Sequence, residues 1–426
     1  MTKRTRKILF FVFFLMFLFI APLIILYYQG WRFDFEKKSL TQTGGIFLKV
    51  IPKQAEIYID GKLVKKTDFF FGSTFIENLL PKKYKIQIKK EGYYPWEKVL
   101  EVKEREVTEA KNIILFPVKS NFEILSKDVE SFWLSPDGKK IVLREKSSPE
   151  EPGWSLKLYD LKKRVKSQLI SEKEIFAKGA DFSDLNWSPD SKEIYLDVAI
   201  KEEEKNFKLD LNKIPPILVE RKIVLPPENV LTYQNLNGNN YFLDNSGILY
   251  LSDSSFSVKE KISEKPFPIK AETKYELNIF SGFIFLREGE TLYLFNHDSR
   301  SFQKLFEKIN TLEVSPDNKK LILLSDFEVW IFFLKEKFEK ETKKAGENLF
   351  LLRLSEKIKD IFWLNSDYLI FNAGEKIEIT EIDERDKLNI VLLAEFKNPE
   401  IFFNQIDKKL YVLSDGILYS SETLLK

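Results

Sequence analysis

The chain has 426 residues, including 38 Phe, 7 Trp and 16 Tyr, but no Cys and a single histidine, His297. The lack of Cys excludes disulfides, thiolate metal sites and cysteine nucleophiles. A single His excludes His–His metal clusters and leaves His297 as the only possible base of a Ser–His–acid triad. With 67 Lys and Arg against 65 Asp and Glu, the net charge of +2 is not that of a nucleic-acid-binding protein.

The first expected elements are a basic tail, residues 1–7, and a transmembrane anchor, residues 8–28. The anchor run contains six Phe and no charged residue, and as a helix it would span about 30 Å, the thickness of a bilayer's hydrocarbon core. Tyr27, Tyr28 and Trp31 follow at the position of an aromatic belt. Because four basic residues precede the run, we expect a cytoplasmic N-terminus and export of the remainder.

A cleaved signal peptide is the alternative interpretation of this N-terminal segment. Such a peptide has a shorter apolar region and small residues at the cleavage site, which residues 26–31 do not provide. We therefore expect an uncleaved, single-pass anchor in the cell membrane. A transmembrane sensor is disfavoured, because only seven residues precede the predicted span. Without the four basic tail residues, 63 positive charges face 65 negative ones, so the exported part is close to neutral.

Residues 29–45 are expected to form a polar stalk, and residues 46–117 a small β-sandwich. Apolar side chains alternate with others from Ile46 to Val50, and again in residues 56–59 and 84–88, which is the period of half-buried strands. Asp60-Gly61 is a strong tight-turn signal, because Gly accepts a positive φ angle. Five or so short strands in this stretch indicate an antiparallel sandwich.

The order of these residues resembles the PEGA domain. The resemblance rests on Pro52-Lys53-Gln54-Ala55, Glu56-Ile57-Tyr58-Ile59-Asp60-Gly61-Lys62, Leu80-Pro81-Lys82-Lys83-Tyr84, and Lys90-Glu91-Gly92-Tyr93 with Trp96. Lys53-Gln54 replaces the usual Glu-Gly, and Lys82 replaces a usual turn Gly. The resemblance implies a non-catalytic module of exported and envelope proteins. Asp60 is then expected in a turn rather than as a ligand, and Tyr93, Tyr94 and Trp96 in packing rather than as a sugar-stacking platform.

Residues 118–426 contain a repeat that predicts a β-propeller. Ser135-Pro136-Asp137-Gly138, Ser188-Pro189-Asp190-Ser191 and Ser315-Pro316-Asp317-Asn318 each precede a strand, and weaker copies start near residues 237, 281, 365 and 404. Their mean spacing of about 45 residues matches a four-stranded blade. A second strand follows every turn, which predicts about seven blades, with six or eight as alternatives. Phe122-Glu123-Ile124-Leu125 is expected to complete the last blade and to lock the ring.

This repeat resembles those of TolB-type propellers. The fold class expected for the whole chain is therefore all-β, with an N-terminal transmembrane helix, a PEGA-like sandwich and a propeller. The repeated position of Asp137, Asp190 and Asp317 favours a structural role for these residues. Two loops, Glu145 to Gly153 and Lys201 to Lys205, are enlarged in the series, and a partner-binding face there is the alternative to tolerated surface insertions.

No catalytic signature identifies a reaction. The chain has no Gly-x-Ser-x-Gly elbow, phosphate loop or His-Glu-x-x-His, and His297 is expected in a surface turn. The charge runs at residues 202–204 and 335–344 are expected to be solvated loops. We therefore predict no catalytic, cofactor-binding or metal-binding residues and no enzymatic activity. The expected function is a membrane-anchored envelope scaffold that binds a protein or a cell-wall polymer, and the alternative is a polysaccharide hydrolase or lyase using carboxylates in the propeller channel.

Overall fold

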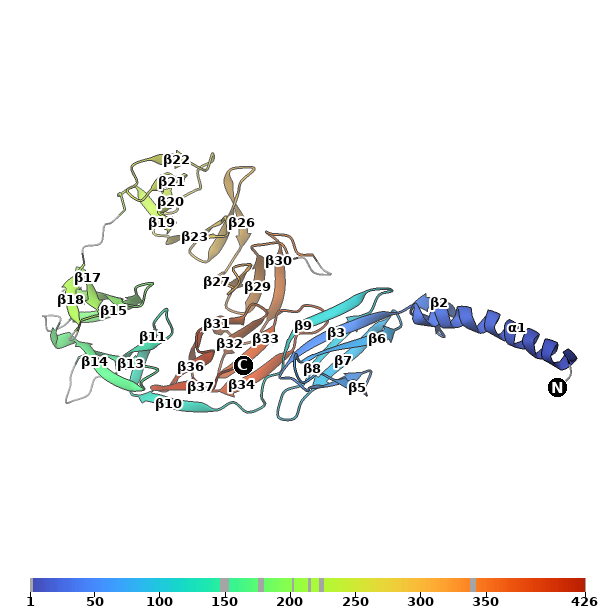
Figure 1. Ribbon diagram of the computed structural model, residues 1–426. Coiled ribbons are helices and arrows are strands. Elements are labelled where there is room, and N and C mark those ends of the chain that lie inside the picture. The colour runs from blue at the N-terminus through green and yellow to red at the C-terminus, as the bar shows by residue number, and fades with distance from the viewer. Residues whose placement is uncertain are drawn as a thin grey trace. The chain divides into compact units, whose positions relative to one another are not determined.

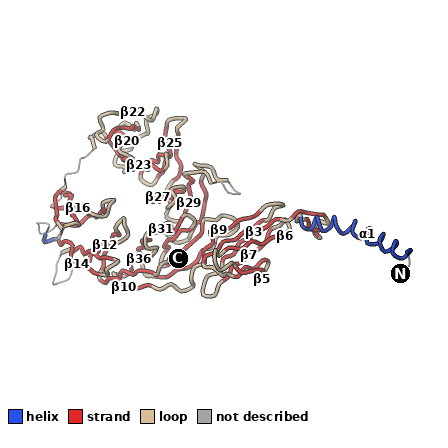
Figure 2. The backbone as a smooth tube through the Cα atoms, viewed as in Figure 1, coloured by secondary structure: helices blue, strands red, loops and turns tan. Residues whose placement is uncertain are grey.

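The computed structural model describes residues 3–145, 153–174, 180–200, 203–213, 216–221, 226–337 and 342–425. They form two compact units, the first comprising Met1–Lys119 with Thr380–Leu393 and the second comprising Ser120–Ile379 with Ala394–Lys426. Strands occupy most of the described chain, and the long helix lies at the N-terminus (Figures 1 and 2). The all-β fold class is thereby confirmed.

The first unit begins with helix α1, Lys3–Tyr28, which contains Pro22 and buries none of its side chains. Its length and apolar composition are sufficient to cross a membrane. A two-stranded hairpin follows, made of β1 (Trp31–Asp34) and β2 (Ser39–Gln42). The segment predicted as a polar stalk is therefore partly a hairpin. The Asp34 carboxylate accepts hydrogen bonds from the backbone N–H groups of Glu36 (2.9 Å) and Lys37 (3.1 Å), which fixes the tight turn.

The small β-domain, defined here as residues 44–114, consists of two sheets around one apolar core. One sheet has the order β6-β3-β9, with bounds Ser73–Leu79, Gly44–Ile51 and Val107–Ile114. The other has the order β5-β4-β7-β8, with bounds Lys62–Lys66, Glu56–Ile59, Lys83–Lys89 and Trp96–Glu101. The expected sandwich is present, but β3 and β9 pair in parallel. Period-two patterning indicates which face a residue occupies and carries no information on strand direction.

The described residues from 120 onward form seven four-stranded sheets of a β-propeller, and two of their strands extend into the segment Thr380–Leu393 of the first unit. Six of them follow the chain order. The first two contain β11 (Val129–Leu134), β12 (Lys140–Glu145), β13 (Ser155–Asp160), β14 (Val165–Ser171), and then β15 (Ala180–Trp187), β16 (Glu193–Ile200), β17 (Glu203–Asp210), β18 (Ile217–Glu220). A short 3₁₀ helix, η1 (Glu172–Glu174), lies between them. The third contains β19 (Val230–Leu236), β20 (Asn239–Asp244), β21 (Leu249–Asp253) and β22 (Lys259–Lys261).

The next three sheets repeat this arrangement. They contain β23 (Tyr275–Phe280), β24 (Phe283–Glu288), β25 (Thr291–Asn296), β26 (Ser301–Phe306), then β27 (Thr311–Val314), β28 (Lys320–Leu324), β29 (Glu328–Phe333), β30 (Asn348–Arg353), and β31 (Ile358–Asn365), β32 (Tyr368–Ala373), β33 (Lys376–Glu381), β34 (Ile390–Glu395). Second strands such as β28 and β32 are buried along their whole length, because neighbouring sheets cover both of their faces.

The last sheet combines both ends of the propeller segment. Its order is β10-β37-β36-β35, with bounds Phe122–Lys127, Ile417–Ser421, Lys409–Ser414 and Glu400–Asn404. The predicted closing strand is thus confirmed, and Ile124 lies opposite Tyr419 in the register. Pairing the first strand with the last removes two free sheet edges.

The Ser-Pro-Asp turns join the first two strands of a sheet, as the sequence predicted. Ser315 is buried, and its hydroxyl donates to Asp317 Oδ1 (2.6 Å) and accepts from the backbone N–H of Lys320 (2.9 Å). Ser135 and Ser188 make the same contacts in their sheets. Trp187 Nε1 also donates to the carbonyl of Trp133 in the preceding sheet (3.3 Å), so the repeat stabilises the junction between sheets as well as each turn.

Candidate functional site

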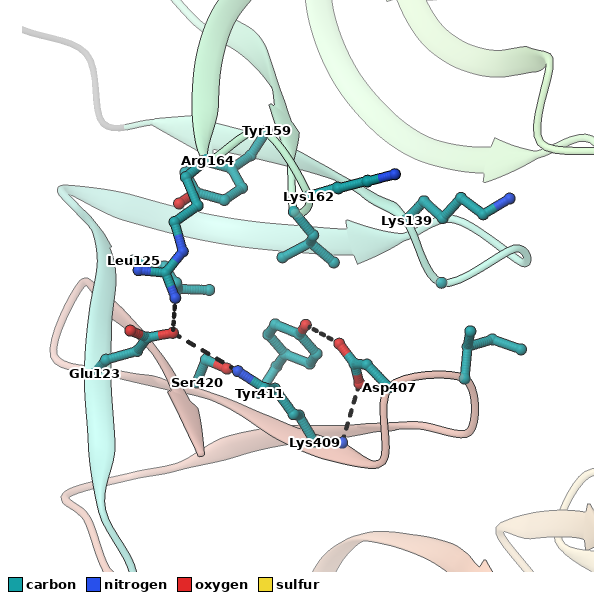
Figure 3. A pocket seen from close by; sticks show the side chains of 13 residues that line it. Glu123, Leu125, Lys139, Tyr159, Lys162, Arg164, Asp407, Lys409, Tyr411 and Ser420 are labelled. Carbon is teal, nitrogen blue, oxygen red and sulfur yellow. Dashed lines mark hydrogen bonds and ion pairs between the residues drawn. The ribbon is translucent and has the colours of Figure 1, made fainter. Parts of the chain in front are cut away.

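A pocket of about 310 Å³ lies in the second unit, between the first sheet of the series and the closing sheet (Figure 3). Its floor is apolar and continuous with one core cluster, to which Leu125, Tyr159, Leu161 and Tyr411 contribute. The Tyr411 hydroxyl donates to Asp407 Oδ2 (2.6 Å). Burial and this contact with Asp407 raise the pKa of Tyr411, so its hydroxyl stays protonated. The Tyr411–Asp407 pair is therefore a fixed, polar part of the floor.

The rim of the pocket is predominantly basic. Lys139, Lys162 and Arg164 come from the first sheet, and Lys409 comes from the closing sheet. The acidic residues are Glu123 and Asp407, so cations exceed carboxylates by four to two. Figure 3 shows Glu123 facing both Arg164 and Lys409, with its Oε1 3.3 Å from Arg164 Nη2 and 3.7 Å from Lys409 Nζ. Lys139 Nζ also lies 3.6 Å from Asp137 Oδ2, beside the pocket lining. With Asp137 included, the four cations exceed the carboxylates by one, and this positive excess favours an anionic ligand.

A glycine contact holds the two sheets together beside this pocket. Gly138 has a φ of +64°, and its carbonyl accepts a hydrogen bond from Asn404 Nδ2 (3.0 Å). A Cβ atom on Gly138 would lie 2.6 Å from Asn404 Oδ1 and 2.8 Å from Ile406 Cβ. Only glycine fits both the dihedral angle and this approach. The Gly of the first Ser-Pro-Asp-Gly turn thus fixes the pocket wall as well as the turn.

A second feature belongs to the small β-domain and is named here the Phe loop, residues 68–72. Phe69, Phe70 and Phe71 are 65%, 74% and 75% exposed. The Asp68 carboxylate holds the loop by accepting from the backbone N–H groups of Phe70 (2.8 Å), Phe71 (2.6 Å) and Ser73 (2.7 Å). Three exposed aromatic rings on an ordered loop form an apolar contact surface.

The residues that the sequence singled out in the small β-domain have structural roles. Asp60 has a φ of 48° in its turn and accepts from the backbone N–H of Lys85 (3.0 Å). Trp96 is buried in the core, and its Nε1 donates to Glu381 Oε2 (2.8 Å). A stacking platform that includes Trp96 is therefore excluded, because its ring faces are covered by protein.

The residues that the sequence singled out in the propeller segment either stabilise turns or lie outside the pocket lining. Asp190 accepts from Ser188 and from the backbone of Lys192, and these contacts lower its pKa. His297 is exposed in the turn after β25, as expected. Of the loop predicted from 201 to 205, Glu203 to Lys205 belong to strand β17, and Lys201 lies outside the described residues. Most of the loop from 145 to 153 lies outside the described residues, as do Glu202 and residues 338–341 of the charge runs.

The pocket cations were not recognised in the sequence. Lys139 and Lys162 lie in hairpin turns, where lysines are usually solvated, and 22 or more residues separate the three contributing turns. Their proximity depends on the pairing of β10 with β37, which brings the two ends of the segment together. The Phe loop had a local signal, since Phe69-Phe70-Phe71 precedes Gly72 within a polar region.

Comparison with known proteins finds one matching family model and several similar solved structures. Residues 43–113 match the family model of the PEGA domain. Among solved structures, YCF48 from Cyanidioschyzon merolae is 12% identical, with a TM-score of 0.42, over 71% of this chain and 98% of that one. The Cps50 (Swd1) β-propeller domain of Myceliophteria thermophila is 12% identical, with a TM-score of 0.40, over 72% and 100%. A chain of a mitotic checkpoint complex is 10% identical, with a TM-score of 0.43, over 72% and 92%. No curated protein matches the chain.

Proposed function

We propose that this chain is a membrane-anchored scaffold of the cell envelope, which binds an acidic group of a protein or cell-wall partner in the basic pocket. One observation carries the proposal, namely the excess of Lys139, Lys162, Arg164 and Lys409 over two carboxylates in a pocket with an apolar floor. Two sheets fix the backbone positions of these cations, and the exposed side chains of Lys139 and Arg164 are accessible to a ligand. The propeller acts as a rigid platform and carries no reaction.

Three features support the anchored, extracytoplasmic arrangement. Helix α1 is long and apolar enough to span a membrane, and none of its side chains is buried in protein. Its basic residues precede the apolar run, which keeps that end cytoplasmic. The PEGA match at residues 43–113 and the resemblance of the Ser-Pro-Asp repeat to TolB-type propellers both favour an exported protein.

The test uses the full chain in detergent micelles and poly-L-glutamate as the acidic probe, with neutral dextran for comparison. We expect the double variant K162E/R164E to weaken poly-L-glutamate binding about tenfold, which is ~1.4 kcal/mol. The control is K163E/K173E, because Lys163 and Lys173 are exposed and do not line the pocket. Equal affinities of the two double variants would refute the pocket as the binding site.

A second candidate function, the carboxylate-based hydrolase or lyase, is favoured by one pair of acids. Asp184 on β15 lies directly opposite Asp197 on β16. Burial raises the pKa of Asp197, and Asp184 raises it further by like-charge repulsion. A carboxylic acid with a raised pKa next to a second carboxylate is an arrangement that acid–base catalysis uses. Release of reducing sugar from purified cell-wall polysaccharide, abolished in D197N, would establish this activity in place of the scaffold.

A further inference from the structure

The β1–β2 hairpin carries an exposed apolar face immediately after the helix. Phe33 and Leu40 are direct cross-strand partners, so their side chains lie on the same face. The ring of Phe35 packs edge-on against that of Phe33, with centroids 5.1 Å apart. Phe33, Phe35 and Leu40 are 48%, 81% and 56% exposed. These three residues, named here the hairpin face, form one continuous apolar surface.

The opposite side of the hairpin is polar, and two of its residues, Asp34 and Thr41, are buried, whereas Ser39 is exposed. Asp34 and Thr41 are each only 5% exposed, although neighbouring Phe33 and Leu40 project to the surface. Successive residues of a strand alternate between its faces, so the hairpin has its polar side inward and its apolar side outward. A hairpin in water has the reverse arrangement, because exposed apolar area is unfavourable. The inverted polarity indicates that the hairpin face contacts a medium other than water.

The position of the hairpin relative to the helix identifies that medium. Arg32 of β1 donates through Nη1 to the carbonyl of Tyr27 at the helix end (2.7 Å), and its guanidinium lies 3.6 Å above the Tyr27 ring. Through Nη2 it also donates to Asn78 Oδ1 in the small β-domain (2.9 Å). Thr43 closes the base of the hairpin, with its N–H and hydroxyl both 2.9 Å from the carbonyl of Gly30. Figure 1 shows β2 beside the C-terminal end of α1.

We propose that the hairpin face inserts into the lipid at the extracytoplasmic surface of the membrane that α1 spans. There it acts as a second anchoring element beside the span. The proposal rests on the membrane anchoring proposed above. Aromatic side chains favour the boundary between headgroups and acyl chains. Lys37 and Lys38 at the turn are placed to reach lipid phosphates, since their stems can extend along apolar surface to a polar layer. The hairpin thereby fixes the small β-domain relative to the bilayer surface.

Depth-dependent fluorescence quenching tests this placement, and the absence of Cys from the chain makes single-site labelling simple. Full-length F35C and L40C proteins, labelled with a polarity-sensitive dye, are placed in phosphatidylcholine–phosphatidylglycerol vesicles. These vesicles carry lipids spin-labelled either near the headgroup or near the chain end. The matched control is F70C in the Phe loop, which is as apolar and nearly as exposed. The Phe loop precedes Ser73, the first residue of β6, which pairs with Lys49. The last residue of β6, Leu79, pairs with Gly44, which is closer to the anchor in the sequence, so the Phe loop lies at the end of β6 away from the anchor.

We expect headgroup-level spin labels to quench the dyes at 35 and 40 several-fold more than the dye at 70. Quenching at 35 and 40 no greater than at 70 would overturn the proposal. A further protein, F17C, is labelled in the middle of α1 and separates failure of the membrane anchor from failure of the hairpin proposal. If chain-end spin labels quench the dye at 17 while 35 and 40 stay unquenched, the anchor stands and the hairpin proposal fails. If the dye at 17 is not quenched, the anchor fails and the hairpin proposal fails with it.

Discussion

Lys98 Nζ lies 2.8 Å from Glu381 Oε1, and the two side chains are 0% and 5% exposed. Both residues belong to the first unit, which includes the segment Thr380–Leu393. Other groups satisfy the remaining hydrogen-bonding capacity of the pair: the carbonyls of Asp383 and Lys387 accept from Lys98, and Trp96 Nε1 and Asn389 Nδ2 donate to Glu381. This buried ion pair therefore attaches a segment distant in sequence to the small β-domain.

Replacing Lys98 with Met should destabilise the first unit strongly. The variant retains the volume of the side chain but leaves the Glu381 carboxylate buried without its cation, which typically costs about 3–5 kcal/mol. The control is K111M, because Lys111 pairs with Glu109 at the surface and such pairs contribute about 0–1 kcal/mol. Urea unfolding of the full-length variants in micelles measures both changes. Equal destabilisation by K98M and K111M would contradict the importance of the buried pair.

Replacing Gly138 with Ala should weaken the junction beside the pocket. The alanine would have an unfavourable positive φ, and its Cβ would lie only 2.6 Å from Asn404 Oδ1. G238A is the matched control, since Gly238 has a φ of +84° but no atom within 4 Å of its added Cβ. We expect G138A to lower the unfolding free energy by about 1–3 kcal/mol more than G238A, the usual cost of overpacking. Thermal unfolding compares the two, and an equal loss would show that the Asn404 contact does not matter.

Replacing Ser315 with Ala tests the repeated turn. The buried hydroxyl accepts from the backbone N–H of Lys320, and its removal leaves a buried donor unsatisfied at a cost of about 1–3 kcal/mol. S299A, in the exposed turn after β25, should change the unfolding free energy by no more than about 0.5 kcal/mol. Chemical denaturation of the full chain measures the difference. If S315A leaves the unfolding free energy unchanged, the turn is maintained by its backbone alone.

The Phe loop should lose its order in acid. Backbone donors from Phe71, Ser73 and Phe70 lower the pKa of Asp68 to about 2, below the value of about 3.9 for an unfolded Asp. Because the folded-state pKa is the lower one, the stabilisation is fully present above pH 4 and is lost as the pH falls through about 2. Hydrogen-exchange protection of the Phe70 and Phe71 amides, corrected for intrinsic rates, reports this loss. Loss of protection already at about pH 5, or full protection below about pH 1.5, would contradict the role of Asp68.

The sequence predicted the propeller well because its signals are local. Pro136 and Asp137 mark a turn that each strong copy repeats, and Phe122 precedes the first copy as an unpaired strand. The structure confirms both the turns and the closing strand. The parallel pairing of β3 with β9 was not predicted, because alternation of apolar residues is the same in either direction.

The pocket and the buried ion pair could not be predicted for a different reason. Lys162 and Lys409 are 247 positions apart, as their numbers show, and only tertiary pairing brings them to one rim. Lys98 shares the buried face of β8 with Trp96 and Leu100, and it pairs there with Glu381. A lone charged residue in a strand gives no local indication that a distant partner neutralises it.

The most direct test of the proposed anchored scaffold is cysteine accessibility in intact cells. K163C places a label site beside the basic pocket, and T5C places one before the apolar run of α1. A membrane-impermeant maleimide should label K163C in intact cells and T5C only after permeabilisation. Labelling of K163C only after permeabilisation would place the pocket in the cytoplasm and contradict the proposed function.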